Sequence, residues 1–174
     1  AIMPLTNSYM TRNRSFYLDI GWQALLKDFG LQPGLILRRA ALPEDLFSRE
    51  DHGLSTDEYF RFWRALDAKA ADPMFAIRIV EAVSAEAFSP PLFAALCSAN
   101  LMQAVQRLAK YKQLVAPMSL DVGVSRAGEL TVSPRWLMEQ TDIPASLQVA
   151  EVAFFLRLAR LATREPVNAQ HVVL

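Results

Sequence analysis

Apolar side chains recur every three to four residues through most of the chain, and this spacing predicts amphipathic helices. Two consecutive helices within residues 87–116, a short one and a long one, are expected to form the centre against which the other segments pack. The remaining segments with a helical period are, in chain order, residues 15–29, 31–42, 55–66, 72–80 and 144–164.

Several predicted helix ends carry residues that start or stop a helix. Ser55 and Glu58 fit a capping box, in which a hydroxyl and an acid three residues later satisfy free backbone N–H groups. Either Ser98 or Asn100 is suited to cap the longer central helix, and Gly30 is suited to end the first helix.

The period changes from helical to alternating after residue 117. Residues 120–124 and 130–132 alternate between apolar and polar or small side chains, and the Gly-containing segment 126–129 joins them, which predicts a β-hairpin. Residues 170–174 predict a third strand on the hairpin edge. We therefore expect a single, mostly helical α+β domain over residues 1–174, with a small antiparallel sheet made of the hairpin and a C-terminal strand.

Two segments carry no regular period. Residues 1–13 are polar or irregular and are expected to form a loose lead-in, and residues 43–53 are expected to form a loop.

Composition narrows the class of protein. Hydrophobic residues make up 52% of the 174 residues and charged residues 21%, which is typical of a globular domain. The formal net charge is zero, so the chain by itself lacks the basic excess that holds DNA or RNA. No apolar run is long enough for a membrane span. The single cysteine, Cys97, excludes an intrachain disulfide and fits a reducing compartment.

One lysine interrupts an apolar helix face. Lys112 lies near the middle of the apolar arc of the long central helix if that helix is regular. We favour a side chain whose stem follows the core while the ammonium group reaches water. The alternative is a buried lysine that pairs with an acid or contacts a ligand.

The last helix is apolar around most of its circumference, which predicts either a central place in the fold or contact with a partner subunit. The central place is the preferred interpretation. Glu151 lies inside the apolar arc and needs a partner there. It is interpreted first as a structural acid paired with Arg78 or Lys112, and alternatively as a carboxylate that faces a ligand cavity.

Signals of catalysis are weak. His52 and His171 have no second ligand at a metal-binding spacing, so neither a metal site nor a catalytic residue is predicted. His52 is expected in a loop and His171 in a strand. Cys97 lies among alanine and leucine residues and is interpreted as an inert, buried thiol. No glycine-rich phosphate loop occurs, and no cofactor is expected.

Aromatic and sulfur-containing side chains offer one further possibility, an apolar pocket for a small molecule. Ordinary core packing is the simpler interpretation of the same residues. With the polar candidates included, the residues proposed to bind a ligand are Glu151, Lys112, Arg78, Tyr111, Phe93, Phe154 and Trp136. Phe88 and Met102 belong to the same aromatic and sulfur-rich set.

The order of segments resembles the N-terminal effector domain of the AraC-type transcription regulators that carry a largely helical, arabinose-binding-like domain. The matching segments are FGLQPGLI at 29–36, STDEYFRFWRAL at 55–66, DPMFAIRI at 72–79 and the stretch at 88–117, followed by the hairpin and the helix with Glu151. A terminal strand with His171 completes the pattern.

This resemblance implies a cytoplasmic bacterial regulator in which the domain senses a small-molecule effector, forms a homodimer, or does both. A C-terminal domain with two helix-turn-helix units, expected beyond residue 174, would bind DNA. Ligands differ within the group, so the name does not imply arabinose. The alternatives are a purely structural dimerisation module and a small enzyme of unrecognised type.

Overall fold

The computed structural model describes residues 16–49, 53–83, 90–114, 116–137 and 142–174. The expected lead-in at 1–13, the helix start at Ser15, part of the 43–53 loop with His52, and Phe88 lie outside these ranges. In chain order the elements are α1 (Ile20–Asp28), α2 (Pro33–Arg39), the 3₁₀ turn η1 (Leu46–Ser48), α3 (Thr56–Asp67), α4 (Phe75–Ala82), α5 (Pro90–Leu96), α6 (Leu101–Tyr111), the 3₁₀ turn η3 (Lys112–Leu114), β1 (Met118–Val124), β2 (Leu130–Trp136) and α7 (Ala145–Thr163).

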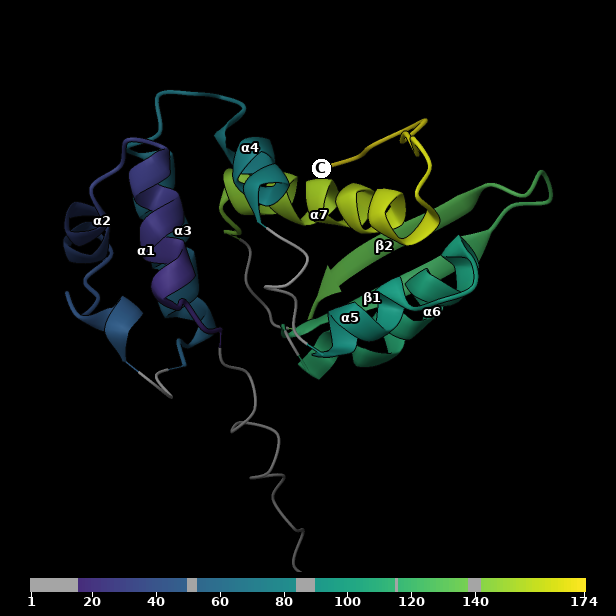
Figure 1. The fold of residues 1–174 in the computed structure, drawn as a ribbon, viewed down its shortest axis with the longest axis horizontal. Coiled ribbons are helices and arrows are strands. Elements are labelled where there is room, and N and C mark those ends of the chain that lie inside the picture. The colour runs from purple at the N-terminus through teal and green to yellow at the C-terminus, as the bar shows by residue number, and fades with distance from the viewer. Residues whose placement is uncertain (1–15, 50–52, 84–89, 115, 138–141) are drawn as a thin grey trace, which may run out of the picture.

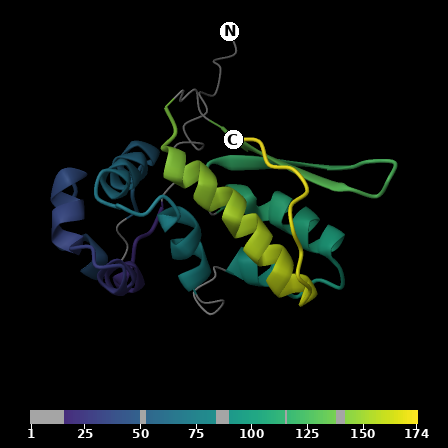
Figure 2. The same cartoon turned by 90° about the horizontal axis from the view of Figure 1, so that it is seen from above.

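The elements form two groups with α7 between them. Helices α1, α2 and α3 lie on one side of the molecule, and α5, α6 and the hairpin lie on the other (Figures 1 and 2). Helix α7 crosses between the groups and contacts α3, α4, α5 and α6. The expected class, a mostly helical α+β domain, is therefore confirmed, and so is the central position of the last helix. The expectation that the two helices within 87–116 form the centre is wrong, because α5 and α6 belong to one of the two groups and α7 is the helix that contacts both.

The core is continuous across the two groups. Leu26 of α1, Phe60 and Leu66 of α3, Leu108 of α6 and Leu147 of α7 are all fully or almost fully buried. Burial of one such side chain stabilises the fold by about 1.5–3 kcal/mol. Contacts within its own chain thus explain a large part of the wide apolar circumference of α7.

The predicted start and stop signals are confirmed at three helix ends. The Ser55 backbone N–H donates to Glu58 Oε2 at 2.8 Å, and the Glu58 backbone N–H donates to Ser55 Oγ at 3.3 Å, which completes the capping box of α3. Asn100 Oδ1 accepts from the Gln103 N–H at 2.9 Å and caps α6. Gly30 follows α1 with φ of +73°, a conformation that favours glycine.

The predicted start of the first helix is wrong. Helix α1 begins at Ile20, with the Asp19 carboxylate accepting from the Gly21 N–H. Phe16 instead lies in an isolated antiparallel bridge with Leu54, and the two residues exchange backbone hydrogen bonds of 3.0 and 2.7 Å. This pairing satisfies backbone groups that a helix would otherwise use, so the helix cannot extend back to residue 16.

The hairpin forms as predicted, but residues 170–174 contain no strand and the described sheet has two strands. The register gives a reason. Leu137 N–H donates to Pro117 O at 2.9 Å, and Leu120 is opposite Pro134. Residue pairs along an antiparallel ladder alternate between hydrogen-bonded and non-hydrogen-bonded, and the bond at Leu137 makes the Leu120–Pro134 pair a non-hydrogen-bonded one. The nitrogen of Pro134 therefore faces the outer edge of β2, where it offers no N–H to a third strand. His171 is therefore not a strand residue.

Arginines on α7 hold neighbouring segments. The Arg157 guanidinium donates to the carbonyls of Glu81 and Val83 at the end of α4. Arg160 Nε donates to the carbonyl of Val167 at 2.8 Å and fastens the tail that follows α7. Within the described ranges, no helix combines the length and apolar character that crossing a membrane would require.

Candidate functional site

Lys112 and Glu151 form an ion pair inside the molecule. Lys112 begins the turn η3 directly after α6, and Glu151 lies in the second turn of α7. The Lys112 Nζ donates to Glu151 Oε2 at 2.8 Å. The Lys112 side chain is only 5% exposed, so the favoured interpretation, an ammonium group that reaches water, is wrong. The prediction of a Glu151–Lys112 pair is confirmed.

The reason for the burial is the position of α7. Periodicity placed Lys112 correctly within the apolar arc, but α7 packs over that arc and closes the route to water. The Glu151 side chain is 16% exposed and is thus the more accessible partner. A buried ammonium group without this acid would carry a large desolvation cost.

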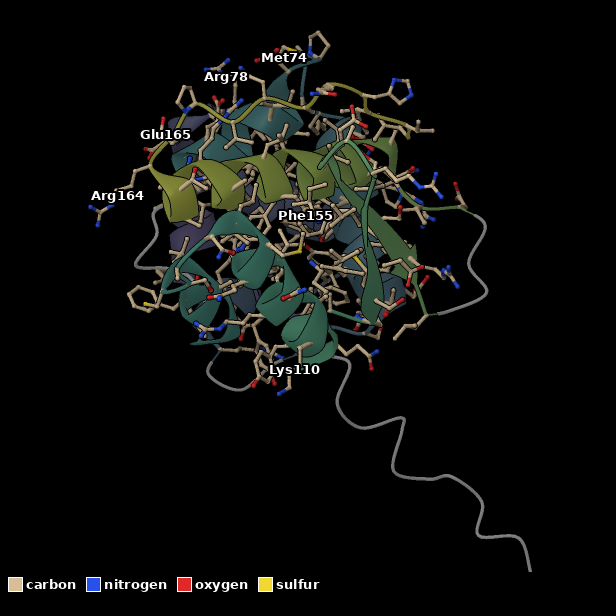
Figure 3. The ribbon with its side chains drawn as sticks, turned by 90° about the vertical axis from the view of Figure 1, so that its right-hand side faces the viewer. Met74, Arg78, Lys110, Phe155, Arg164 and Glu165 are labelled. Carbon is tan, nitrogen blue, oxygen red and sulfur yellow. The ribbon has the colours of Figure 1, made fainter. Side chains whose placement is uncertain are left out.

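Two phenylalanines of α7 surround the ammonium group. Lys112 Nζ lies 5.5 Å from the ring centroid of Phe155 and 6.0 Å from that of Phe154. Both distances are within the range of a cation–π interaction. Figure 3 shows Phe155 on the side of α7 that faces the α5 and α6 helices. The site therefore combines one buried cation with aromatic walls.

Helix α3 adds two polar aromatic side chains. Tyr59 stacks on Phe16 with ring centroids 3.9 Å apart and packs edge-on against Trp63 at 6.2 Å. Burial and the negative charge of Glu151 raise the pKa of Tyr59, and a hydrogen-bond contribution from the Trp63 side chain lowers it. The Tyr59 hydroxyl group is therefore within electrostatic reach of Glu151 and next to the Trp63 side chain.

The indole N–H of Trp63 is an unusual feature of this cluster. Trp63 is 2% exposed, and its Nε1 makes no hydrogen bond of standard geometry within the described residues. Tyr59 and Trp63 fall on the apolar face of α3 by helical period, so the period alone does not reveal their polar ends. The available signal was chemical, because a buried tryptophan or tyrosine usually needs a partner for its N–H or O–H group.

Arg78 is engaged elsewhere. Its guanidinium pairs with the Asp72 carboxylate at 2.6 Å and lies 5.3 Å from the ring centroid of Phe29. The backbone N–H of Met74 and the side chain of Arg78 hold the pKa of Asp72 below its ordinary value. Figure 3 shows Arg78 beside Met74 at one edge of the molecule. The Arg78 alternative for the Glu151 partner is therefore wrong.

Arg78 also lines an open surface groove of about 370 Å³ between the end of α1 and the start of α4. Phe29, Leu31 and Phe75 contribute apolar lining, and Lys69 lies at the same groove. The residues that line this groove do not include Lys112 or Glu151.

The other candidate residues have different surroundings. Phe93 on α5 is 52% exposed, so it presents its ring to solvent. Trp136 packs edge-on against Phe60 with ring centroids 5.2 Å apart. The ring of Tyr111 has the Lys110 ammonium group 5.2 Å from its centroid. Of the proposed ligand-binding residues, Glu151, Lys112 and Phe154 are the ones that these contacts bring together.

Cys97 and the metal-binding side chains complete the chemical survey. Cys97 is exposed, so the prediction of a buried thiol is wrong; it lies just past the end of the short helix α5. In the part of the chain that the structure describes, no group of three or more His, Cys, Asp or Glu side chains is placed to hold a metal ion.

Comparison with known proteins adds a family assignment. Residues 30–174 match the model of a family described as the arabinose-binding domain of AraC transcription regulator, N-terminal. The matched range includes Lys112, Glu151 and the helices α3 and α7, but it begins after α1. No curated protein matches the chain.

Proposed function

The chain belongs to the family of N-terminal arabinose-binding domains of AraC transcription regulators, and from this membership we propose that it senses a small-molecule effector. In this proposal the effector controls DNA binding by a separate C-terminal domain with helix-turn-helix units. The domain is regulatory and catalyses no reaction, and it acts in the bacterial cytoplasm. The match over residues 30–174 is the observation that carries the proposal.

The Lys112–Glu151 pair supports a specific place for the sensing site. Glu151 belongs to α7, which contacts four other helices, and Lys112 lies at the junction of α6 with the hairpin. A ligand that breaks or replaces the Lys112–Glu151 contact therefore changes how α7 is held against α6 and the start of the hairpin. We propose that Lys112, Glu151 and Phe154 form the sensing site, with Tyr59 and Trp63 beside them.

We further propose that the domain forms a homodimer, as expected for a regulator of this family. Other helices of the same chain cover part of the apolar circumference of α7, so this circumference does not by itself mark the interface. The observation that motivated a purely structural dimerisation module is weakened accordingly. Light scattering at high micromolar concentration tests the homodimer, and a monomer under those conditions would count against it.

Thermal unfolding in the presence of a broad metabolite panel tests the sensing function. The panel includes sugars, amino acids, nucleosides and organic acids, each at millimolar concentration. A compound present at one hundred times its Kd stabilises the fold by about 2.7 kcal/mol, which corresponds to a rise in Tm of about 5–10 °C. If no compound shifts Tm and isothermal calorimetry detects no binding, the sensing proposal fails.

A further inference from the structure

The two halves of the buried ion pair differ in their access to water. Lys112 is enclosed, with 5% of its side chain exposed, whereas 16% of the Glu151 side chain is exposed. All residues of α7 from 151 to 157 are half-buried. Glu151 can therefore rotate toward solvent about its own side-chain bonds, whereas Lys112 has no such route.

This asymmetry means that Glu151 occupies a site for a carboxylate. We propose that the effector is a carboxylic acid whose carboxylate replaces that of Glu151 on the Lys112 ammonium group, with Glu151 turning out to solvent. This inference rests on the proposed sensing function and names the chemical class of its ligand. Glu151 then acts as an internal competitor that keeps the site closed when the effector is absent.

The balance of charge at the buried pair favours a carboxylate over other ligand groups. The pair has a net charge of zero in its present state, and exchanging one carboxylate for another leaves Lys112 neutralised. A cationic ligand would meet the buried ammonium group directly and be repelled. An anion that entered without displacing Glu151 would leave one excess negative charge in the interior, at a large desolvation cost.

Space and shape set the form of the acid. Rotation of Glu151 vacates the volume of its carboxyethyl group, so the ligand has an unbranched segment next to its carboxylate. The vacated position lies beside Phe154 and Phe155, whose rings are within 6.0 Å of Lys112 Nζ. An aromatic or aliphatic body continuing from that segment would lie along these half-buried rings.

The indole N–H of Trp63, which makes no hydrogen bond of standard geometry to a described residue, is a further donor for the same ligand. One carboxylate oxygen binds Lys112, and the second is free to accept from Trp63 Nε1 or from the Tyr59 hydroxyl group. The Glu151 carboxylate is tethered to the α7 backbone, which limits how closely it can approach α3. A free acid has no such tether and can lie closer to α3.

The test measures binding of defined acids to matched variants. The probes are phenylacetate, 3-phenylpropionate and hexanoate, each compared with its amide, and L-arabinose and D-xylose as neutral polyols. The variants are Glu151→Gln, Glu151→Asp and Lys112→Met, with Lys110→Met as the control. Lys110 is exposed, and Figure 3 shows it at the outer end of α6, away from α7. Calorimetry gives Kd, and circular dichroism confirms that each variant is folded.

We expect at least one acid, but not its amide, to bind the wild-type chain. Glu151→Gln removes the competitor and should tighten that binding about tenfold or more, because Lys112 is no longer occupied by an internal carboxylate. Glu151→Asp, whose shorter side chain reaches Lys112 less well, should give an intermediate gain even if Glu151→Gln folds poorly. Lys112→Met should abolish binding, and Lys110→Met should leave it unchanged.

Two results would overturn the proposal in distinguishable ways. If a polyol or another neutral compound binds and Glu151→Gln weakens it, Glu151 is a ligand-reading group; the sensing function then stands, and the carboxylate class is wrong. If neither these probes nor the broad metabolite panel bind to any variant, the proposed function and this inference fail together.

Discussion

Removing either partner of the Lys112–Glu151 pair should destabilise the fold, and the two costs should be unequal. At 2.8 Å and an effective dielectric constant of about 20, the attraction is about 6 kcal/mol. Desolvation of both ions offsets much of it. Glu151→Leu leaves an enclosed ammonium group without its acid, so we expect a loss of about 3–5 kcal/mol.

Lys112→Met should cost less, about 1–2 kcal/mol, because the remaining Glu151 carboxylate is partly exposed and can turn to water. In the double variant, methionine and leucine pack together with no charge left to desolvate. Its stability should lie within about 1 kcal/mol of the wild type, or above it. The double-mutant cycle then isolates the interaction between the two side chains.

Urea unfolding followed by circular dichroism measures these free energies. The control is the Arg135–Asp121 pair on the hairpin, whose side chains are 73% and 59% exposed and 2.6 Å apart. Arg135→Gln should cost less than about 1 kcal/mol, and salt should reduce that cost further. A Glu151→Leu variant that loses less than 1 kcal/mol, or less than Lys112→Met, would refute the assignment of Lys112 as the enclosed partner.

Three further predictions concern single residues. In the folded state the pKa of Tyr59 is raised above its ordinary value of 10.0. The contribution of the protonated phenol to the stability of the fold is therefore intact below about pH 10 and declines as the pH rises further. Tyr59→Phe should flatten this alkaline loss in urea titrations, and an unchanged profile would contradict the burial of the phenol. Cys97 should react with a thiol reagent in the native state about as fast as in the unfolded chain; protection until unfolding would show that it is covered. Ser55→Ala should lower the free energy of unfolding by about 1 kcal/mol by removing the α3 cap, and a change below about 0.3 kcal/mol would contradict it.

Features encoded by neighbouring residues could be predicted from the sequence. The capping box of α3 needs only Ser55 and Glu58, three positions apart, and the hairpin needs only alternation and a short turn. In both cases the side chains that determine the structure are in contact with the backbone that they organise. Helix α7 was placed correctly for a similar reason, since its apolar circumference reports burial whatever covers it.

Features that depend on distant partners could not be predicted in the same way. Phe16 leaves the helical pattern because Leu54 pairs with its backbone, and no residue near Phe16 signals this. Cys97 has apolar neighbours in sequence, but its exposure depends on where α5 ends relative to α6. The sequence could not relate Tyr59 to Glu151, because the two residues come together only where α7 packs against α3.

The attachment of α7 at its other end decides what release of Glu151 would do. Arg157 holds the carbonyls at the end of α4, and Arg160 holds the following tail at Val167. Both contacts lie C-terminal to Glu151 and involve no part of Lys112, so they persist when the ion pair opens. The change would then be confined to the first half of α7 and the junction of α6 with the hairpin. A ligand shifts this equilibrium only by its different affinity for the open and closed pair. The net strength of the Lys112–Glu151 interaction, measured by the double-mutant cycle, therefore sets the binding energy that an effector must supply.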